Sequence, residues 1–180
     1  MSSSTPHHVP AGSAGDSLVR TPSGVLVPAV VDPFHRALSH LAPSQLVDQT
    51  AQTSGMRRLE AISGATVGAR HLWMGQTHVP AGTVSASHHH GASETAIYVV
   101  SGHPCFVFLD VDGEKPVETR IQTGPGDYVF VPPWVPHREE NPDAEAEAVV
   151  VIARTTQQAV VVNLDGLDWS QVDPSDPRAV

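Results

Sequence analysis

Cysteine, lysine and charged residues in general are scarce in this chain of 180 residues. Cys105 is the only cysteine, so no intramolecular disulfide can form, which fits a reducing compartment. Lys115 is the only lysine and lies in a polar turn, which argues against Schiff-base chemistry. Charged residues make up 16% of the chain and the formal net charge is -9, so we expect no binding to nucleic acid or to an anionic membrane.

Long apolar segments are also missing from the sequence. The apolar run at residues 25–31 is too short to span a bilayer and contains Pro28. Residues 1–15 have neither the charged start nor the apolar centre of a signal peptide. We therefore expect a soluble, cytoplasmic protein with no membrane partner.

Short apolar segments dominate much of the chain, separated by turn residues that include many of its 16 prolines and 14 glycines. Apolar segments of this length between turn residues are typical of β-strands. Nine short strands are predicted, at residues 58–62, 71–79, 83–88, 95–101, 105–110, 117–122, 127–131, 146–153 and 159–164. So many short strands with so little helix predict an all-β fold, an antiparallel sandwich or barrel.

The sequence divides into four parts along its length. They are a disordered N-terminal segment (1–24), an N-terminal extension (25–55), the β-barrel (56–165) and an acidic C-terminal tail (166–180). The extension contains one predicted helix, because Asp32 is a capping residue, Pro33 suits the first helical position, and apolar residues recur at helical spacing as far as Leu41.

Histidine is abundant, with 11 copies, and it is clustered. In the run His88-His89-His90, alternation along a strand places His88 and His90 on one face and His89 on the other. Glu94 follows shortly afterwards. Two imidazoles with a nearby carboxylate are a typical ligand set for a divalent transition metal, and His137, after a turn rich in proline, is a candidate fourth ligand.

These two segments resemble the two motifs of the cupins, small antiparallel β-barrels with a metal in the barrel mouth. The first motif runs Gly, five residues, His-x-His, three or four residues, Glu, six residues, Gly. The second runs Gly, five residues, Pro-x-Gly, two residues, His, three residues, Asn. The matching residues are Gly82, His88, His90 and Glu94 in the first motif, and Gly126, Pro132, His137 and Asn141 in the second.

The sequence departs from the cupin motifs at two points. Trp134 replaces the middle glycine of the second motif. Seven residues, not six, separate Glu94 from Gly102, so Thr95 occupies the usual register of the glutamate. Glu94 is retained as the predicted ligand because threonine is a poor ligand for such metals; the alternative is that Glu94 orients a histidine without binding the metal. The resemblance extends over residues 56–164.

The resemblance implies a cupin-type jelly-roll barrel that binds one metal ion through His88, His90, Glu94 and His137. Fe(II) is the expected ion, with Mn, Ni and Zn as alternatives. It also implies a metal-dependent enzyme acting on a small organic molecule, with a dioxygenase placed ahead of an isomerase or a decarboxylase. The alternative is a non-catalytic module that binds a small molecule or a sugar.

Several further side chains are assigned to a substrate pocket or to packing. Cys105, inside an apolar run, is interpreted as a small buried hydrophobe and not as a nucleophile. Arg138, beside His137, is a candidate clamp for a substrate carboxylate. The predicted pocket residues are Tyr98, Tyr128, Phe130, Trp134 and Arg138.

A homodimer is also expected. An isolated barrel of this kind leaves edge strands open, and such edges are usually covered in native proteins. The strand at residues 58–62 and the helix at residues 34–41 are the segments available for packing between subunits.

Overall fold

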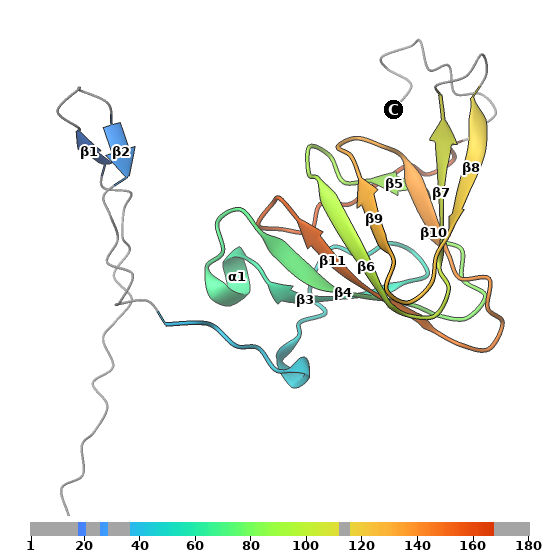
Figure 1. Cartoon of the computed structure of the whole chain (residues 1–180), viewed down its shortest axis with the longest axis horizontal. Helices are drawn as coiled ribbons and strands as arrows, with labels where there is room; N and C mark the ends of the chain where they lie inside the picture. Colours follow the sequence, from blue (N-terminus) through green and yellow to red (C-terminus); the bar gives the residue numbers. More distant parts are fainter. Residues whose placement is uncertain (1–17, 21–25, 29–36, 112–115, 168–180) are drawn as a thin grey trace, which may run out of the picture. The chain divides into compact units, whose positions relative to one another are not determined.

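The computed structural model describes residues 18–20, 26–28, 37–111 and 116–167 (Figure 1). It divides into two units, residues 1–39 and 40–180. In the first unit, strands β1 (Leu18–Arg20) and β2 (Leu26–Pro28) pair in antiparallel fashion. Residues 18–20 belong to the segment 1–24, for which disorder is predicted; its other residues lie outside the described residues, as does most of the predicted acidic tail.

The predicted helix of the N-terminal extension is absent where the structure describes it. Residues 32–36 lie outside the described residues, and residues 37–41 are not helical. Leu38, on the expected apolar face, is fully exposed, and a helix this short is unstable without packing. The described helical segments are instead a 3₁₀ turn, Pro43–Gln45, and α1 (Gly64–Val67), whose first turn is capped by the Ser63 hydroxyl.

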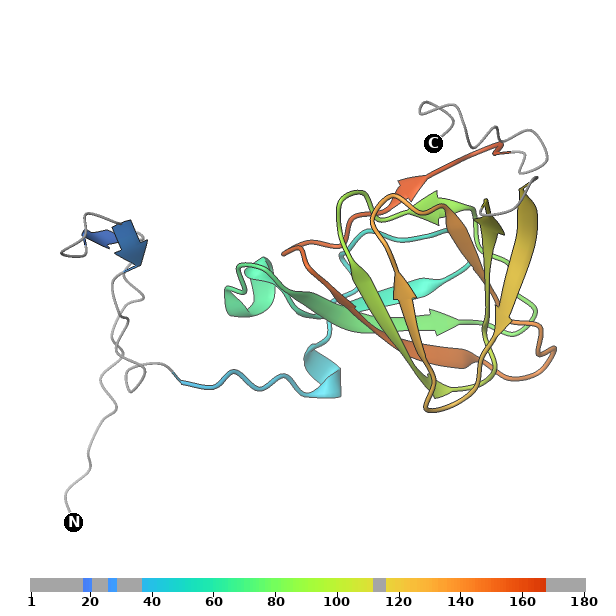
Figure 2. The same ribbon diagram turned by 45° about the horizontal axis from the view of Figure 1, so that its top comes forward.

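Two five-stranded antiparallel sheets face each other in the second unit and form a jelly-roll sandwich, which confirms the all-β prediction (Figures 1 and 2). The first sheet has the strand order β3 (Arg57–Ile62), β4 (Trp73–Val79), β11 (Ala148–Arg154), β6 (Thr95–Ser101), β9 (Tyr128–Val131). The second has the order β12 (Val162–Asn163), β5 (His88–His89), β10 (His137–Glu140), β7 (Cys105–Asp110), β8 (Val117–Gln122).

The predicted strands agree with the structure to different degrees. Those at residues 95–101, 105–110 and 117–122 coincide with β6, β7 and β8. The segment 83–88 is mostly irregular and enters the second sheet only at β5. Strand β10 is missing from the prediction because its charged residues resemble an exposed rim.

The core lies between the two sheets and follows the alternation of the strands. In β4, β6 and β11, every second side chain is buried, as expected for sheets with one face towards a core. The buried apolar cluster consists of Trp73, Ile97, Val99, Phe106, Val131, Val150 and Ile152. In the part of the chain that the structure describes, no helix is long and apolar enough to cross a membrane.

Gly75 provides a test of this packing. It lies on the buried face of β4, where an added Cβ would be 2.2 Å from the Leu59 carbonyl oxygen and 2.7 Å from the Trp73 ring. The Leu59 carbonyl belongs to the backbone and cannot move aside as a flexible side chain could. Gly75→Ala should therefore lower the free energy of unfolding, measured in urea, by about 1–3 kcal/mol. Gly124→Ala is the matched control, since its Cβ would make only contacts of 3.4 Å or more. Equal stability of the two variants would contradict this packing.

Candidate metal centre

Three histidines meet inside the sandwich. His88 on β5 lies directly opposite His137 on β10 in the antiparallel register, and His90 follows His88 by two residues. The three ring centroids lie 4.5–5.1 Å apart, with 4.5 Å between His88 and His137 and 5.1 Å between His88 and His90. All three side chains are buried, and one potential ligand atom from each lies within 4.8 Å of the other two.

Each imidazole is oriented by a hydrogen bond to a backbone carbonyl. Nδ1 lies 3.0 Å from the Ala86 oxygen in His88, 3.1 Å from the Val160 oxygen in His90, and 2.9 Å from the Val135 oxygen in His137. A carbonyl oxygen only accepts, so Nδ1 carries the proton and donates, which leaves the lone pair on Nε2.

The Nε2 atoms are the natural donors for a metal ion. Those of His88 and His137 are buried and have no hydrogen-bond partner in the described structure. Burial lowers the pKa of His137 to about 4, and burial together with the charge of Arg154 moves the pKa of His90 far below its usual range. His90 and His137 are therefore neutral at pH 7, the form that coordinates a divalent ion, and this donor set fits a metal.

The structure does not place Glu94 with the histidines, which corrects the sequence prediction. Glu94 is exposed just before β6, whereas Thr95 is fully buried. Alternation along β6 turns Thr95 inward with Ile97 and Val99, so Glu94 and Tyr98 lie on the outer face. The spacing of seven residues to Gly102 was the signal of this register.

Glu139 is a buried carboxylate that the sequence analysis missed. It is 3% exposed and shares the inner face of β10 with His137, two residues earlier. Its Oε2 lies 3.7 Å from His88 Nε2 and accepts a hydrogen bond from Ser85 Oγ at 3.3 Å. Burial raises the pKa of this carboxyl, but electrostatic interactions with the neighbouring histidines and with Arg58 and Arg154 lower it overall. Counting two residues on from His137 could have identified it.

Two buried arginines share this interior. The guanidinium of Arg154 stacks 5.4 Å from the centre of the Trp73 ring, and its Nη2 lies 3.3 Å from His90 Nε2. Arg58 donates to the Ala51 carbonyl at 2.5 Å. Burial lowers the pKa of both groups, and that of Arg154 to about 9, which still leaves Arg154 charged at neutral pH.

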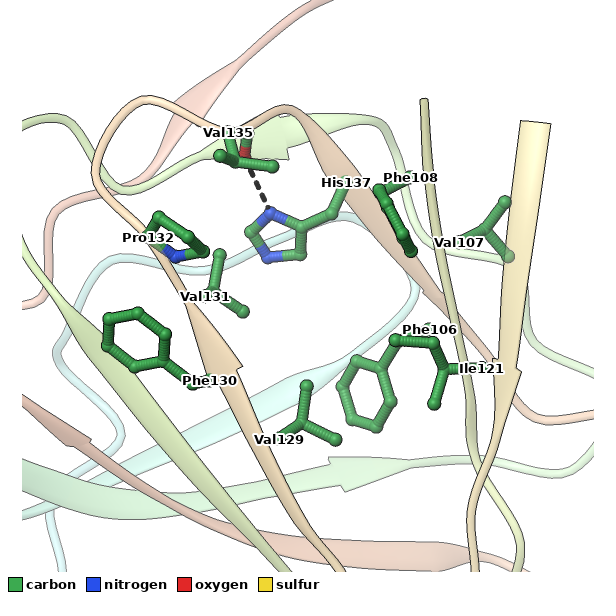
Figure 3. A pocket seen from close by; sticks show the side chains of 10 residues that line it. All are labelled: Phe106, Val107, Phe108, Ile121, Val129, Phe130, Val131, Pro132, Val135 and His137. Carbon is green, nitrogen blue, oxygen red and sulfur yellow. Dashed lines mark hydrogen bonds between the residues drawn. The ribbon is translucent and has the colours of Figure 1, made fainter. Parts of the chain in front are cut away.

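An apolar pocket of about 180 Å³ lies between β9 and the strands β7 and β8, with His137 in its wall (Figure 3). Figure 3 shows the Phe106 ring and the Val129 side chain on the opposite side of the pocket from His137. The lining residues are Phe106, Val107, Phe108, Ile121, Val129, Phe130, Val131, Pro132, Val135 and His137.

Of the five predicted pocket residues, only Phe130 lines this pocket. Tyr98 and Tyr128 stack on the outer face with ring centroids 4.9 Å apart. Trp134 is mostly exposed and adopts a positive φ of 65°, a backbone conformation that favours glycine, which is the residue of the cupin motif at this position. Arg138 lies on the outer face of β10, where it pairs with Glu140 and with Glu118 of β8.

Comparisons with known proteins agree with this architecture. Residues 75–153 match the Cupin domain family, Cupin_2, so the chain contains a cupin domain and the expected family is confirmed. No curated protein matches the sequence.

Solved structures share the fold at low sequence identity. Oxalate decarboxylase from Bacillus subtilis is 19% identical with a TM-score of 0.54, and the match covers 64% of this chain and 29% of that chain. This chain thus spans less than a third of that protein. The polyketide cyclase RemF from Streptomyces resistomycificus is 18% identical with a TM-score of 0.55, over 74% of this chain and 89% of that chain. An oxalate oxidase with bound glycolate, a substrate analogue, is 18% identical with a TM-score of 0.52, over 64% and 60% of the two chains.

Glu139 should be the carboxylate on which the metal-free fold depends. Its charge opposes two buried guanidinium groups, so Glu139→Gln should lower the free energy of unfolding by about 2 kcal/mol or more. The measurement is urea denaturation with a chelator present. Glu94→Gln, an identical change at an exposed site, should stay within about 0.5 kcal/mol of the parent. A larger loss at Glu94 than at Glu139 would contradict this assignment.

Proposed function

We propose that this protein is a metal-dependent enzyme that binds one divalent ion through Nε2 of His88, His90 and His137 and acts on a small organic molecule. The observation that carries the proposal is the convergence of three buried imidazoles, each bonded through Nδ1 to a backbone carbonyl so that Nε2 keeps its lone pair, with one potential ligand atom of each within 4.8 Å of the other two. The lone pairs of His88 and His137 are buried without a partner, which is unfavourable, and a metal ion removes that penalty.

The side chains around the centre have separate tasks. A bound ion would supply Lewis-acid or oxygen chemistry, because three protein ligands leave positions open for substrate. Glu139 stays ionised beside His88, so it can accept a proton from the substrate and supplies the negative charge that was expected from Glu94. The apolar pocket, with Phe106 and Phe130 in its wall, excludes water and holds the apolar part of the substrate.

We favour Fe(II) and an O₂-dependent oxidation. Three neutral nitrogen donors do not cancel the charge of the ion, and the open positions can take both O₂ and substrate. A Mn(II)-dependent decarboxylation is the second candidate. It is supported by the shared fold with oxalate decarboxylase of Bacillus subtilis, one structure of which is described by its Mn(II) centers and is 20% identical with a TM-score of 0.56. Ni and Zn remain alternatives for the ion.

Metal binding should stabilise the fold. An ion that binds only the folded state adds about 2.7 kcal/mol at a hundredfold excess over Kd. Fe(II), Mn(II) or Ni(II) should therefore raise the melting temperature of the chelated protein by several degrees. His88→Ala, His90→Ala and His137→Ala should each lose this shift and the bound metal measured by elemental analysis. His78→Ala, which removes a histidine outside the cluster, should keep both the shift in melting temperature and the bound metal.

Glu94→Gln is the control for the register of β6. It should retain metal at the parental level, since the side chain is exposed. An unchanged melting curve for the parent protein, with no metal in it, would contradict the proposed centre. Loss of metal in Glu94→Gln would restore the four-ligand site expected from the sequence.

Catalysis should be detected by oxygen consumption. Protein loaded with Fe(II) should consume O₂ with at least one member of a panel of small aromatic and aliphatic acids, and the His137→Ala variant should not. Release of CO₂ by Mn(II)-loaded protein without O₂ uptake would favour the decarboxylase. The absence of turnover with either metal, despite binding, would favour a non-catalytic binding module.

A further inference from the structure

The interior beside the three histidines carries more positive than negative side-chain charge. Arg58 and Arg154 are each 1% exposed, and among the described residues neither forms an ion pair with a carboxylate. Glu139 is the carboxylate that acts on both arginines electrostatically. Glu140 pairs with arginines of the outer face, and Glu60 accepts from an indole and a hydroxyl. Two buried cations thus share one buried anion, which is unfavourable without a further negative charge.

Unsatisfied polar atoms accompany this excess charge. The Nε atoms of Arg58 and Arg154 are buried without a hydrogen-bond partner, as are the hydroxyls of Thr77 and Thr95. The strand register places Thr95 directly opposite Arg154 and Thr77 directly opposite Arg58, in each case on the inner face. Each arginine therefore has an unpaired hydroxyl as its cross-strand neighbour. The terminal nitrogens of both arginines have partners, so the donors without an acceptor are the two Nε–H groups and the two hydroxyls.

The contact between Arg154 and His90 links these donors to the metal centre. Arg154 Nη2 lies 3.3 Å from His90 Nε2, whose lone pair is the one that a metal ion would use. The lone pair of His90 Nε2 cannot accept from Arg154 and bind a metal ion at the same time. If a metal ion takes it, Arg154 loses an acceptor and gains a neighbouring positive charge, so its need for an anionic partner increases.

We propose that Arg154, supported by Arg58, forms an anion-binding site beside the three histidines, and that the substrate is a small carboxylate whose charged group lies against Arg154. Arg154 Nη1 donates to the Val160 carbonyl at 3.0 Å, and Arg154 Nε has no partner. A planar guanidinium suits a carboxylate, because two parallel N–H donors can match its two oxygens. The apolar part of the same molecule occupies the pocket next to His137, lined by Phe106 and Phe130. Arg154 thus takes the role that the sequence analysis assigned to Arg138. The inference rests on the proposed function only in treating this anion as the substrate.

Isothermal titration calorimetry with benzoate and benzamide tests the site, because the two probes have similar shapes and differ in charge. The full chain is titrated both metal-free and loaded with Ni(II), whose content is measured separately. Benzoate should bind at least tenfold more tightly than benzamide to the Ni(II)-loaded protein. Arg154→Gln should remove this preference, and Arg154→Lys should restore part of it. Arg57→Gln, which removes the charge of the exposed neighbour of Arg58, should leave it unchanged.

Thr95→Val keeps the test valid if Arg154→Gln does not fold. It replaces an unpaired hydroxyl by a methyl group, so its melting temperature should not fall, whereas its benzoate affinity should drop several-fold. Equal affinity of the parent protein for benzoate and benzamide, or an unchanged preference in Arg154→Gln, would overturn the inference. Protein that holds Ni(II) without preferring benzoate would refute the anion site alone. A preference for benzoate in protein that binds no metal would refute the metal centre alone.

Discussion

The pairing of β5 with β10 is the constraint on which the candidate site depends. It places His88 opposite His137, with both side chains turned inward. A shift of one residue in this register would turn His137 outward and bring Arg138 into the interior. The same alternation directs Glu139 inward, while Glu140 and Arg138 pair on the outer face. One short polar strand thus supplies a candidate metal ligand, a buried carboxylate and an ion pair on the outer face.

The interior is more polar than a core needed only for stability. Its apolar half, around Trp73 and Ile152, packs as expected for a sandwich, but histidines, arginines and a glutamate are buried next to it. Unsatisfied buried groups destabilise a fold, and proteins retain such groups mainly where function requires them. The unpaired atoms of His88, His137 and Arg154 all belong to this one region. The proposed metal and the proposed anion would each supply partners that these atoms lack.

Much of this arrangement could be predicted from residue spacing. Turn residues and apolar segments located β6, β7 and β8, and the spacing of His88 and His90 along a strand predicted their shared face. Two features are hinted at by spacing but are decided by the fold. The charged sequence of β10 resembles an exposed rim, and although Glu139 lies two residues after His137, its burial is decided by the opposite sheet. The ligand role of Glu94 was mistaken because the register of β6 is set by pairing with β11, which turns Thr95 inward.

X-ray absorption spectroscopy of the zinc-loaded protein tests the central claim most directly, because it identifies the ligands without depending on any reaction. Three imidazole nitrogens from His88, His90 and His137 should lie at about 2.0–2.1 Å from the ion, with the outer-shell scattering of imidazole rings. Any remaining ligand should be an oxygen from water or a carboxylate. A spectrum with oxygen ligands only, or with fewer than three imidazoles, would contradict the account.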